Sequence, residues 1–215
     1  MINTSSTLEA AKTNAINSSR DFLGERSSLL FNGKEYLPYH PLEKEHPYLT
    51  VTWLKGTVDY SGDRYSNIFL PYDTYTDQLI TKYFTGDFCL VKPFVASFTI
   101  GSRKFVQLRD STVKPGFYEM LFDNKFKVYA KREKILHETT SVDQAIRRNF
   151  EERTRYLLHK NGSFIEVKNR KSLLQAFASQ AAALKQFIRE KRLKFKSSTF
   201  EASLIQSTAF CEQLP

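Results

Sequence analysis

Two aspartates, Asp73 and Asp77, have the best placement in this sequence for acid–base chemistry. They flank an expected turn within residues 70–79, and Tyr72 and Tyr75 crowd the same segment. Paired carboxylates can divide the roles of general acid and general base when their environments differ. Asp at a turn position, however, more often accepts hydrogen bonds from its own backbone. The alternative is that the four side chains line the rim of a pocket, and we assign no catalytic residue.

Other reactive side chains lack the partners that chemistry needs. Cys89 lies in an apolar strand, where a small buried side chain is expected, and no G-x-S-x-G motif is present. His40, Glu43, Glu45 and His46 form the best cluster of metal-ligand types, but their spacing on a proline-rich loop matches no standard site. Glycine-rich phosphate loops are also absent. We therefore expect no metal, no cofactor and no enzyme activity.

The two cysteines, Cys89 and Cys211, are too far apart in sequence for a CxxC motif. A disulfide that ties the C-terminal tail to the body is one interpretation, and two buried free thiols are the other. Cysteine usage therefore does not fix the compartment.

Positive charge is concentrated in the C-terminal part of the 215-residue chain. Residues 1–123 hold 13 Lys and Arg against 14 Asp and Glu, whereas residues 124–215 hold 19 against 9. A basic region favours an anionic partner, such as an acidic protein, an anionic membrane surface or nucleic acid. The alternative is that these basic residues form a solvated helix face that binds no partner. The candidate contacts for an anionic partner are Arg189, Lys191, Arg192, Lys194 and Lys196.

Nucleic acid ranks below the other anionic partners. No RNA-recognition, zinc-finger or helix-turn-helix pattern accompanies the basic residues. The chain also lacks a run of about 18 apolar residues, so we expect no transmembrane span.

Residues 28–168 have the sequence pattern that is typical of an antiparallel β domain. The chain holds 18 Phe and 11 Tyr, which suit a half-buried pleated surface. Short alternating runs are divided by turn signals, which predicts an α+β fold, mainly antiparallel β, whose meander closes as a barrel or a sandwich. Hairpins are expected at Asn32-Gly33, Ser61-Gly62, Gly101-Ser102, Asp123-Asn124 and Asn161-Gly162.

Three segments depart from this pattern. Residues 1–27 are predicted to form a flexible or weakly helical leader, with no apolar segment typical of a signal peptide. Residues 133–153 are highly charged and hold a capping-box spacing at Ser141 and Gln144, which indicates a short helix or, alternatively, an exposed excursion. Residues 169–215 are predicted to form a basic helical tail packed on the β domain, with helices near 172–193 and 199–212.

Several motifs together resemble an uncharacterised family of Bacteroidota proteins that usually carry a signal peptide. The motifs are Gly56–Tyr65, Asn67–Asp73, Asp77–Ile80, Phe105–Leu108, Gly116–Glu119, Val128–Arg132, Leu184–Arg189 and Leu193–Phe195. The resemblance covers about residues 30–212. It implies an exported, periplasmic or envelope location, and it transfers no catalytic residue.

The leading expectation is a non-enzymatic cell-envelope binding or scaffold protein, whose partner is a protein or an anionic surface. The first alternative is a carrier of an apolar small molecule, with a cavity lined by residues such as Phe69, Phe98 and Phe117. The second alternative is nucleic-acid binding through the basic tail. A scaffold predicts a filled core, whereas a carrier predicts a large apolar cavity.

Overall fold

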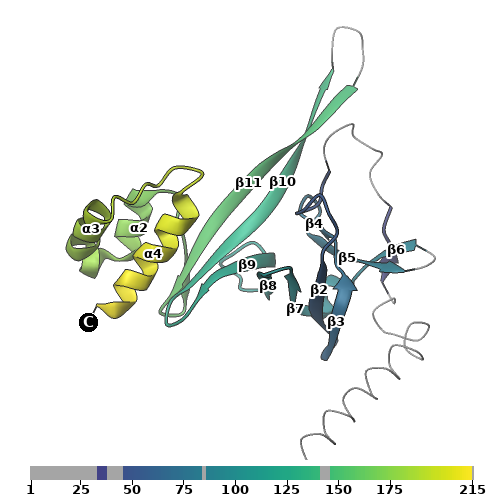
Figure 1. The fold of residues 1–215 in the computed structure, drawn as a ribbon, viewed down its shortest axis with the longest axis horizontal. Helices are drawn as coiled ribbons and strands as arrows, with labels where there is room; N and C mark the ends of the chain where they lie inside the picture. The colour runs from purple at the N-terminus through teal and green to yellow at the C-terminus, as the bar shows by residue number, and fades with distance from the viewer. Residues whose placement is uncertain (1–32, 38–45, 84–85, 141–145, 215) are drawn as a thin grey trace, which may run out of the picture.

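Two antiparallel sheets and a group of C-terminal helices make up the fold in this computed structural model, which describes residues 33–37, 46–83, 86–140 and 146–214 (Figure 1). The larger sheet has eight strands in the order β12-β11-β10-β9-β8-β7-β2-β3. Its strands are β2 (Lys55–Tyr60), β3 (Asp63–Phe69), β7 (Val95–Ile100), β8 (Arg103–Leu108), β9 (Gly116–Asp123), β10 (Lys127–Thr140), β11 (Ile146–Lys160) and β12 (Ser163–Glu166). The smaller sheet, in the order β1-β6-β5-β4, comprises β1 (Lys34–Glu35), β4 (Tyr72–Asp73), β5 (Gln78–Tyr83) and β6 (Gly86–Cys89).

The predicted mainly antiparallel β fold is confirmed, and both sheets are open. Within the described residues the outer strands of the large sheet, β12 and β3, pair with one neighbour each. The barrel alternative therefore does not apply, and a sandwich-like arrangement fits. We call β1–β9, with the short 3-10 turn Lys92–Phe94, the β body.

Turn chemistry sets the local hairpins as the sequence predicts. Ser61 and Gly62 have φ of 52° and 89° between β2 and β3, and Asn161 and Gly162 have φ of 51° and 76° between β11 and β12. Positive φ at both central residues is the requirement of the tight type I′ turn. The predicted leader and the strand before Asn32-Gly33 lie outside the described residues.

The segment 133–153 corrects an expectation. The prediction of a short helix is wrong for its described residues, because β10 and β11 continue as one long hairpin paired out to Thr140 and Ile146. Opposite charges face one another across the two strands, with Glu133 opposite Arg153 and Lys134 opposite Glu152. Such cross-strand pairs stabilise a ladder, so the charges that suggested an excursion support strands instead. The suggested capping box, Ser141 and Gln144, lies outside the described residues.

The C-terminal helices are α2 (Arg170–Ala176), the 3-10 turn Ala178–Gln180, α3 (Ala181–Glu190) and α4 (Phe200–Gln213). The second predicted helix is confirmed within about one residue of each end. The first is interrupted at Phe177, whose φ of −114° and ψ of 45° end α2. The Phe177 ring is fully buried and packs edge-on against Phe126 at 5.4 Å between centroids. We call residues 170–213 the helical layer.

The helical layer and the β body lie on opposite sides of the long hairpin (Figure 1), and each contains a hydrophobic core. The core of the β body packs Tyr72 of the small sheet against Phe98, Phe105 and Phe117 of the large sheet. The core of the helical layer packs the helices against strand and turn residues, which include Val128. The long hairpin contributes Val128 and Leu158 to the core of the helical layer, whereas the core of the β body contains no residue of β10 or β11.

Candidate functional site

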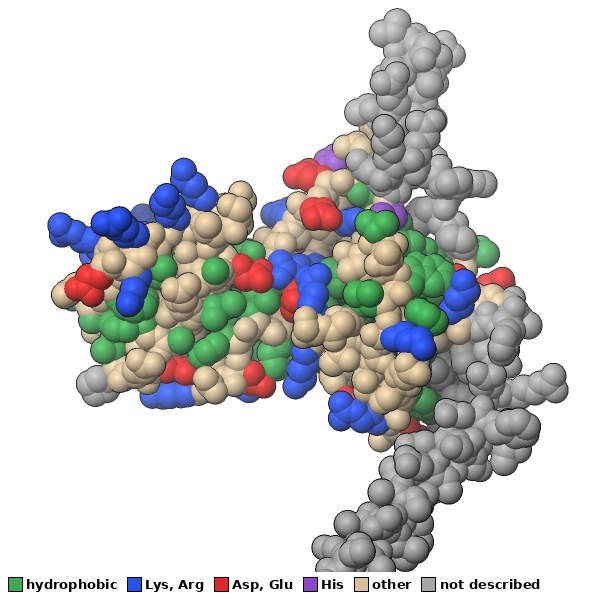
Figure 2. All heavy atoms as spheres, in the orientation of Figure 1, with side chains coloured by type: hydrophobic (Ala, Val, Ile, Leu, Met, Phe, Trp, Pro, Cys, Tyr) green, Lys and Arg blue, Asp and Glu red, His purple; other side chains and the backbone are tan. Residues whose placement is uncertain are grey.

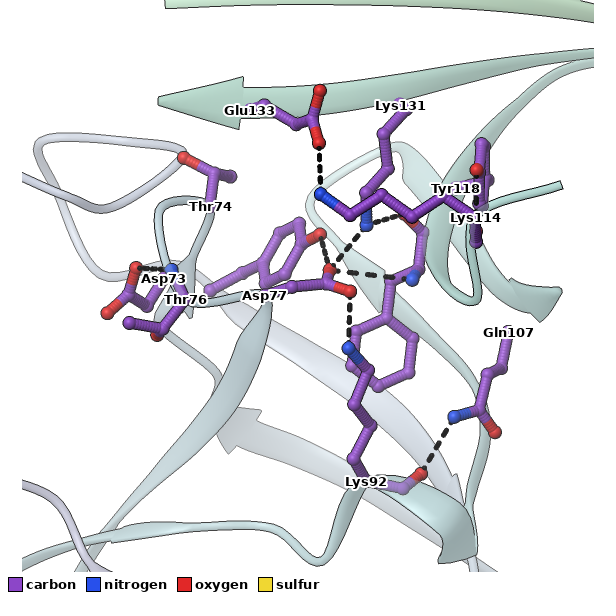
Figure 3. Close-up of polar contacts among 12 residues, drawn as sticks. Asp73, Thr74, Thr76, Asp77, Lys92, Gln107, Lys114, Tyr118, Lys131 and Glu133 are labelled. Atoms are coloured by element: carbon purple, nitrogen blue, oxygen red, sulfur yellow. Dashed lines mark hydrogen bonds and ion pairs between the residues drawn. The ribbon is translucent and has the colours of Figure 1, made fainter. Parts of the chain in front are cut away.

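Asp77, between β4 and β5, is the centre of the first candidate site (Figure 3). Its φ of 58° places it in the left-handed region, which Asp tolerates better than most residues. This backbone conformation turns the carboxylate towards the start of β9 and the buried face of β10. The position follows from the turn that the sequence predicts, whereas its partners come from distant strands.

Two lysines share the Asp77 carboxylate. Lys131 Nζ lies 2.7 Å from Asp77 Oδ1, and Lys92 Nζ forms an ion pair with Asp77 Oδ2. The Tyr72 hydroxyl donates to Oδ1 at 2.5 Å, and the Phe117 backbone N–H donates to it at 3.4 Å. The carboxylate oxygens are therefore occupied by internal donors.

Lys131 is one of the most buried charged side chains that the structure describes, with 1% of the residue exposed. Its ammonium also donates to the Phe117 carbonyl at 3.1 Å and lies 5.2 Å from the centre of the Tyr118 ring. Burial lowers the pKa of Lys131, and the neighbouring Asp77 opposes that shift. An enclosed, fully paired ammonium fits the anchor of a fold better than an accessible nucleophile.

Gly116 is required for this arrangement. Its φ is +153°, and a Cβ built there would lie 2.2 Å from Asp77 Oδ2 and 2.6 Å from Lys131 Nζ. Both distances are shorter than any real contact of a Cβ atom allows. The missing side chain is therefore what lets the two charges meet across the start of β9.

Asp73 serves its own turn, as one of the two sequence interpretations predicts. Its Oδ1 accepts hydrogen bonds from the backbone N–H groups of Tyr75 and Thr76, both at 2.9 Å, and its Oδ2 accepts from the Tyr36 hydroxyl at 3.1 Å. Tyr72 and Asp73 are buried, with 1% and 0% exposed, so they do not lie at an open rim. Tyr75 is the exposed member of the four, and its ring packs against Phe150 with centroids 5.6 Å apart.

A second charge network joins the β body to the helical layer. Arg103 holds buried Glu119 through two hydrogen bonds of 2.7 Å, and Arg132 donates to Glu119 Oε2 at 2.7 Å. Arg132 also donates to Glu201 of α4 at 2.7 Å. A polar hollow of about 270 Å³ lies beside this network, lined in part by these arginines and by Glu201. Since its arginines are engaged by carboxylates, the network braces two layers together.

Both cysteines are free thiols, so the disulfide interpretation is wrong; Cys211 is buried as expected, whereas Cys89 is half-buried. The Cys89 thiol is half-buried and donates to Gln78 Oε1 at 3.1 Å. Burial raises the pKa of Cys89, and it raises that of Cys211 to about 11. A raised pKa keeps a thiol protonated and therefore a poor nucleophile at neutral pH.

The basic residues chosen from the sequence lie on the outer surface of the helical layer. Arg189 is in the last turn of α3, and Lys191, Arg192, Lys194 and Lys196 follow on the segment that leads to α4. All five are exposed, and none forms an ion pair with another residue that the structure describes. Figure 2 shows Lys and Arg gathered along this edge of the helical layer. The five form a cationic surface without internal counter-ions.

Three further cations belong to the same layer, and the sequence analysis did not select them. Arg170, Lys171 and Lys185 line a shallow hollow of about 650 Å³ between α2 and α3. Lys185 lies one helical turn before Arg189, so the two side chains share a face of α3. The basic start of α2, Arg170-Lys171, was the available signal. Its pairing with Lys185 depends on how the helices pack, which no local pattern specifies.

Among the described residues, no helix is long and apolar enough to cross a membrane, and no group of three or more potential ligands is placed to hold a metal ion. No family model, curated protein or solved structure matches the chain.

Proposed function

We propose that the protein is a non-enzymatic binding protein of the cell envelope that holds an acidic protein partner against its helical layer. The observation that carries the proposal is the group of exposed cations on this layer that form no ion pair with another described residue. Complementary charge steers association and suppresses wrong partners. The envelope location rests on the sequence resemblance alone.

The β body supports a binding role over a carrier role. Two of the residues considered for a cavity, Phe98 and Phe117, are 1% exposed and pack edge-on with centroids 5.1 Å apart. Phe98 also stacks on Phe105 at 4.8 Å, whereas Phe69 is 42% exposed at the outside. Rings in mutual contact fill the space that an apolar ligand needs.

A non-enzymatic role is supported by how the carboxylates are used. Asp73 holds its turn, Asp77 holds two lysines, and Glu119 holds two arginines. A general base needs a lone pair that faces a substrate, and these carboxylates direct theirs at internal donors.

The test compares two variants that each lose five positive charges. In the first, the five exposed cations of the helical layer, Arg189, Lys191, Arg192, Lys194 and Lys196, become Gln. In the matched control, five exposed lysines of the β body and its neighbouring turn, Lys34, Lys55, Lys82, Lys104 and Lys125, become Gln. The probe is labelled poly-glutamate, and binding is followed by fluorescence anisotropy at several salt concentrations.

We expect the helical-layer variant to bind poly-glutamate at least about tenfold more weakly than the wild type, because each tenfold step requires only about 1.4 kcal/mol spread over five charges. The control should stay within about twofold, since its charges are scattered. Equal losses in both variants would show that net charge alone attracts the probe, and would overturn the proposal. Stronger binding of an anionic vesicle or a DNA duplex to the same cations would move the function to one of those partners.

A further inference from the structure

The hollow between α2 and α3 has an apolar floor and a basic rim. We call its apolar lining residues, Leu174, Ala178 and Ala181, the floor and its cationic lining residues, Arg170, Lys171 and Lys185, the rim; Gln175 completes the lining. The floor side chains are short apart from Leu174, which is half-buried. Ala178 and Ala181 carry small side chains, so the backbone of a partner can approach the floor closely.

The rim cations have no ion pair with any other described residue. Arg170 and Lys171 belong to α2 and Lys185 belongs to α3, so both helices contribute positive charge to the hollow. A partner that matches both features needs an apolar crest with acidic side chains on its flanks. An amphipathic helix with Glu or Asp beside its apolar stripe has this form.

The neighbouring surface argues against a lipid bilayer as the occupant. The large hydrophobic side chains that are exposed in the described structure are Leu37, Val51, Leu54, Phe69, Tyr75 and Phe94. All of them lie outside the helical layer, whose large apolar side chains are buried or half-buried, so the layer offers little apolar surface for insertion among lipid chains. A flat bilayer surface would also leave a hollow unfilled.

The aromatic side chains of the layer argue against single-stranded nucleic acid. Phe187 stacks on Phe210 with centroids 4.1 Å apart, and Phe195 packs edge-on against Phe200 at 5.7 Å. Rings engaged with one another leave no platform on which bases stack. The charge complementarity that remains is that of an acidic protein segment.

We propose that this hollow seats an acidic amphipathic helix of a partner protein, with its apolar crest on the floor and its carboxylates at the rim. The inference deepens the function proposed above and rests on it. It adds a defined binding position and a secondary structure for the partner segment.

The experiment uses the full chain and two synthetic peptides of about 20 residues, long enough to form a helix in solution. One carries a Leu stripe flanked by Glu, and the other has the same composition in scrambled order. In the protein, Ala178→Glu places a charge on the floor. Ser179→Glu places the same charge on the neighbouring exposed residue, which does not line the hollow. Circular dichroism verifies that both variants keep their helices.

We expect the amphipathic peptide to bind the wild type about tenfold more tightly than the scrambled peptide. Ala178→Glu should abolish that preference, and Ser179→Glu should retain it. Lys185→Gln should weaken binding of the amphipathic peptide more than Lys191→Gln does, although each substitution removes one positive charge. Poly-glutamate should not distinguish the two members of either pair.

Two results separate this inference from the proposed function. In the first, the variant that lacks five cations binds poly-glutamate more weakly, but Ala178→Glu and Ser179→Glu have the same affinity for the amphipathic peptide. The hollow is then not the binding site, and only the broader function stands. If the wild type binds poly-glutamate no better than that variant does, both proposals fail. Equal affinity for the amphipathic and the scrambled peptide would also overturn the helix as occupant.

Discussion

The β body and the helical layer use charge in opposite ways. In the body, Asp77 meets the buried Lys131 of β10 at 2.7 Å, and Arg103 meets Glu119 through two hydrogen bonds. In the layer, cations such as Arg189 and Lys191 are exposed and lack counter-ions among the described residues. Charges satisfied inside the molecule specify its geometry, whereas charges left unsatisfied at its surface remain available to a partner.

The same contrast holds for the apolar side chains. In the body, three phenylalanine rings pack edge-on against Tyr72, and in the layer Phe187 stacks on Phe210. Both regions therefore have their own packed core. The two regions differ at their outer surfaces: among the described residues, exposed cations of the layer lie beside an apolar hollow, whereas the exposed lysines of the body are scattered.

Among the substitutions that test this contrast, the largest loss of stability is expected at Asp77. Asp77→Asn keeps a residue that tolerates positive φ but removes the charge shared by Lys92 and Lys131. Removing one partner of a buried ion pair costs about 3–5 kcal/mol, because the other charge is left uncompensated. Urea unfolding of the variant at neutral pH measures this loss.

The stability of the Asp77→Asn variant should also depend on pH in a way that identifies Lys131 as the cause. Burial lowers the pKa of Lys131, and without Asp77 only the smaller effect of the Glu133 charge opposes that shift. A lysine whose pKa is lowered in the folded state penalises folding below that pKa, and the penalty disappears as pH rises towards 10.5. The variant should therefore recover stability in alkaline solution relative to the wild type. The exposed pair Lys127–Asp123 provides the control, since Asp123→Asn should cost at most about 1 kcal/mol.

A smaller effect is expected at Glu119. Burial raises the pKa of Glu119, but the hydrogen bonds and charges of Arg103 and Arg132 outweigh it and leave the pKa below its usual 4.5. A lowered carboxyl pKa stabilises the fold above 4.5, and this contribution is lost as pH falls through the folded-state pKa. Glu119→Gln should reduce stability at pH 7 by about 1.5–3 kcal/mol. The difference from the wild type should shrink below pH 4.5 in urea unfolding, and a constant difference down to pH 2 would contradict the ionic explanation.

The sequence predicted features that depend on neighbouring residues. The turn at Ser61-Gly62 and the helix near 199–212 followed from the positive-φ requirement of a tight turn and from the 3–4 residue apolar spacing. The turn role of Asp73 followed in the same way, because Asp accepts from backbone groups two and three residues further along.

Features that depend on distant pairing could not be predicted from the sequence. Lys131 lies far from Asp77 in the chain, and the space in which the two meet depends on the absence of a side chain at Gly116. The long hairpin was missed because alternating charges suit a solvated helix and a cross-strand ladder equally well until the register is known. The hollow was missed because Lys185 faces Arg170 only after α2 and α3 have packed.

The smallest effect on stability is expected where the binding effect is largest. Neutralising the five exposed cations of the helical layer removes no ion pair within the described structure, so the free energy of unfolding should change by less than about 0.5 kcal/mol per site. At low ionic strength the variant should be slightly more stable than the wild type, because the five cations of the wild type repel one another. Added salt should remove this difference in stability, since it screens the repulsion. Urea unfolding at two ionic strengths measures both. A large cooperative loss of stability would mean that these charges hold the layer together as Asp77 holds the body, and the division between an internally satisfied body and an outward-facing layer would then fail.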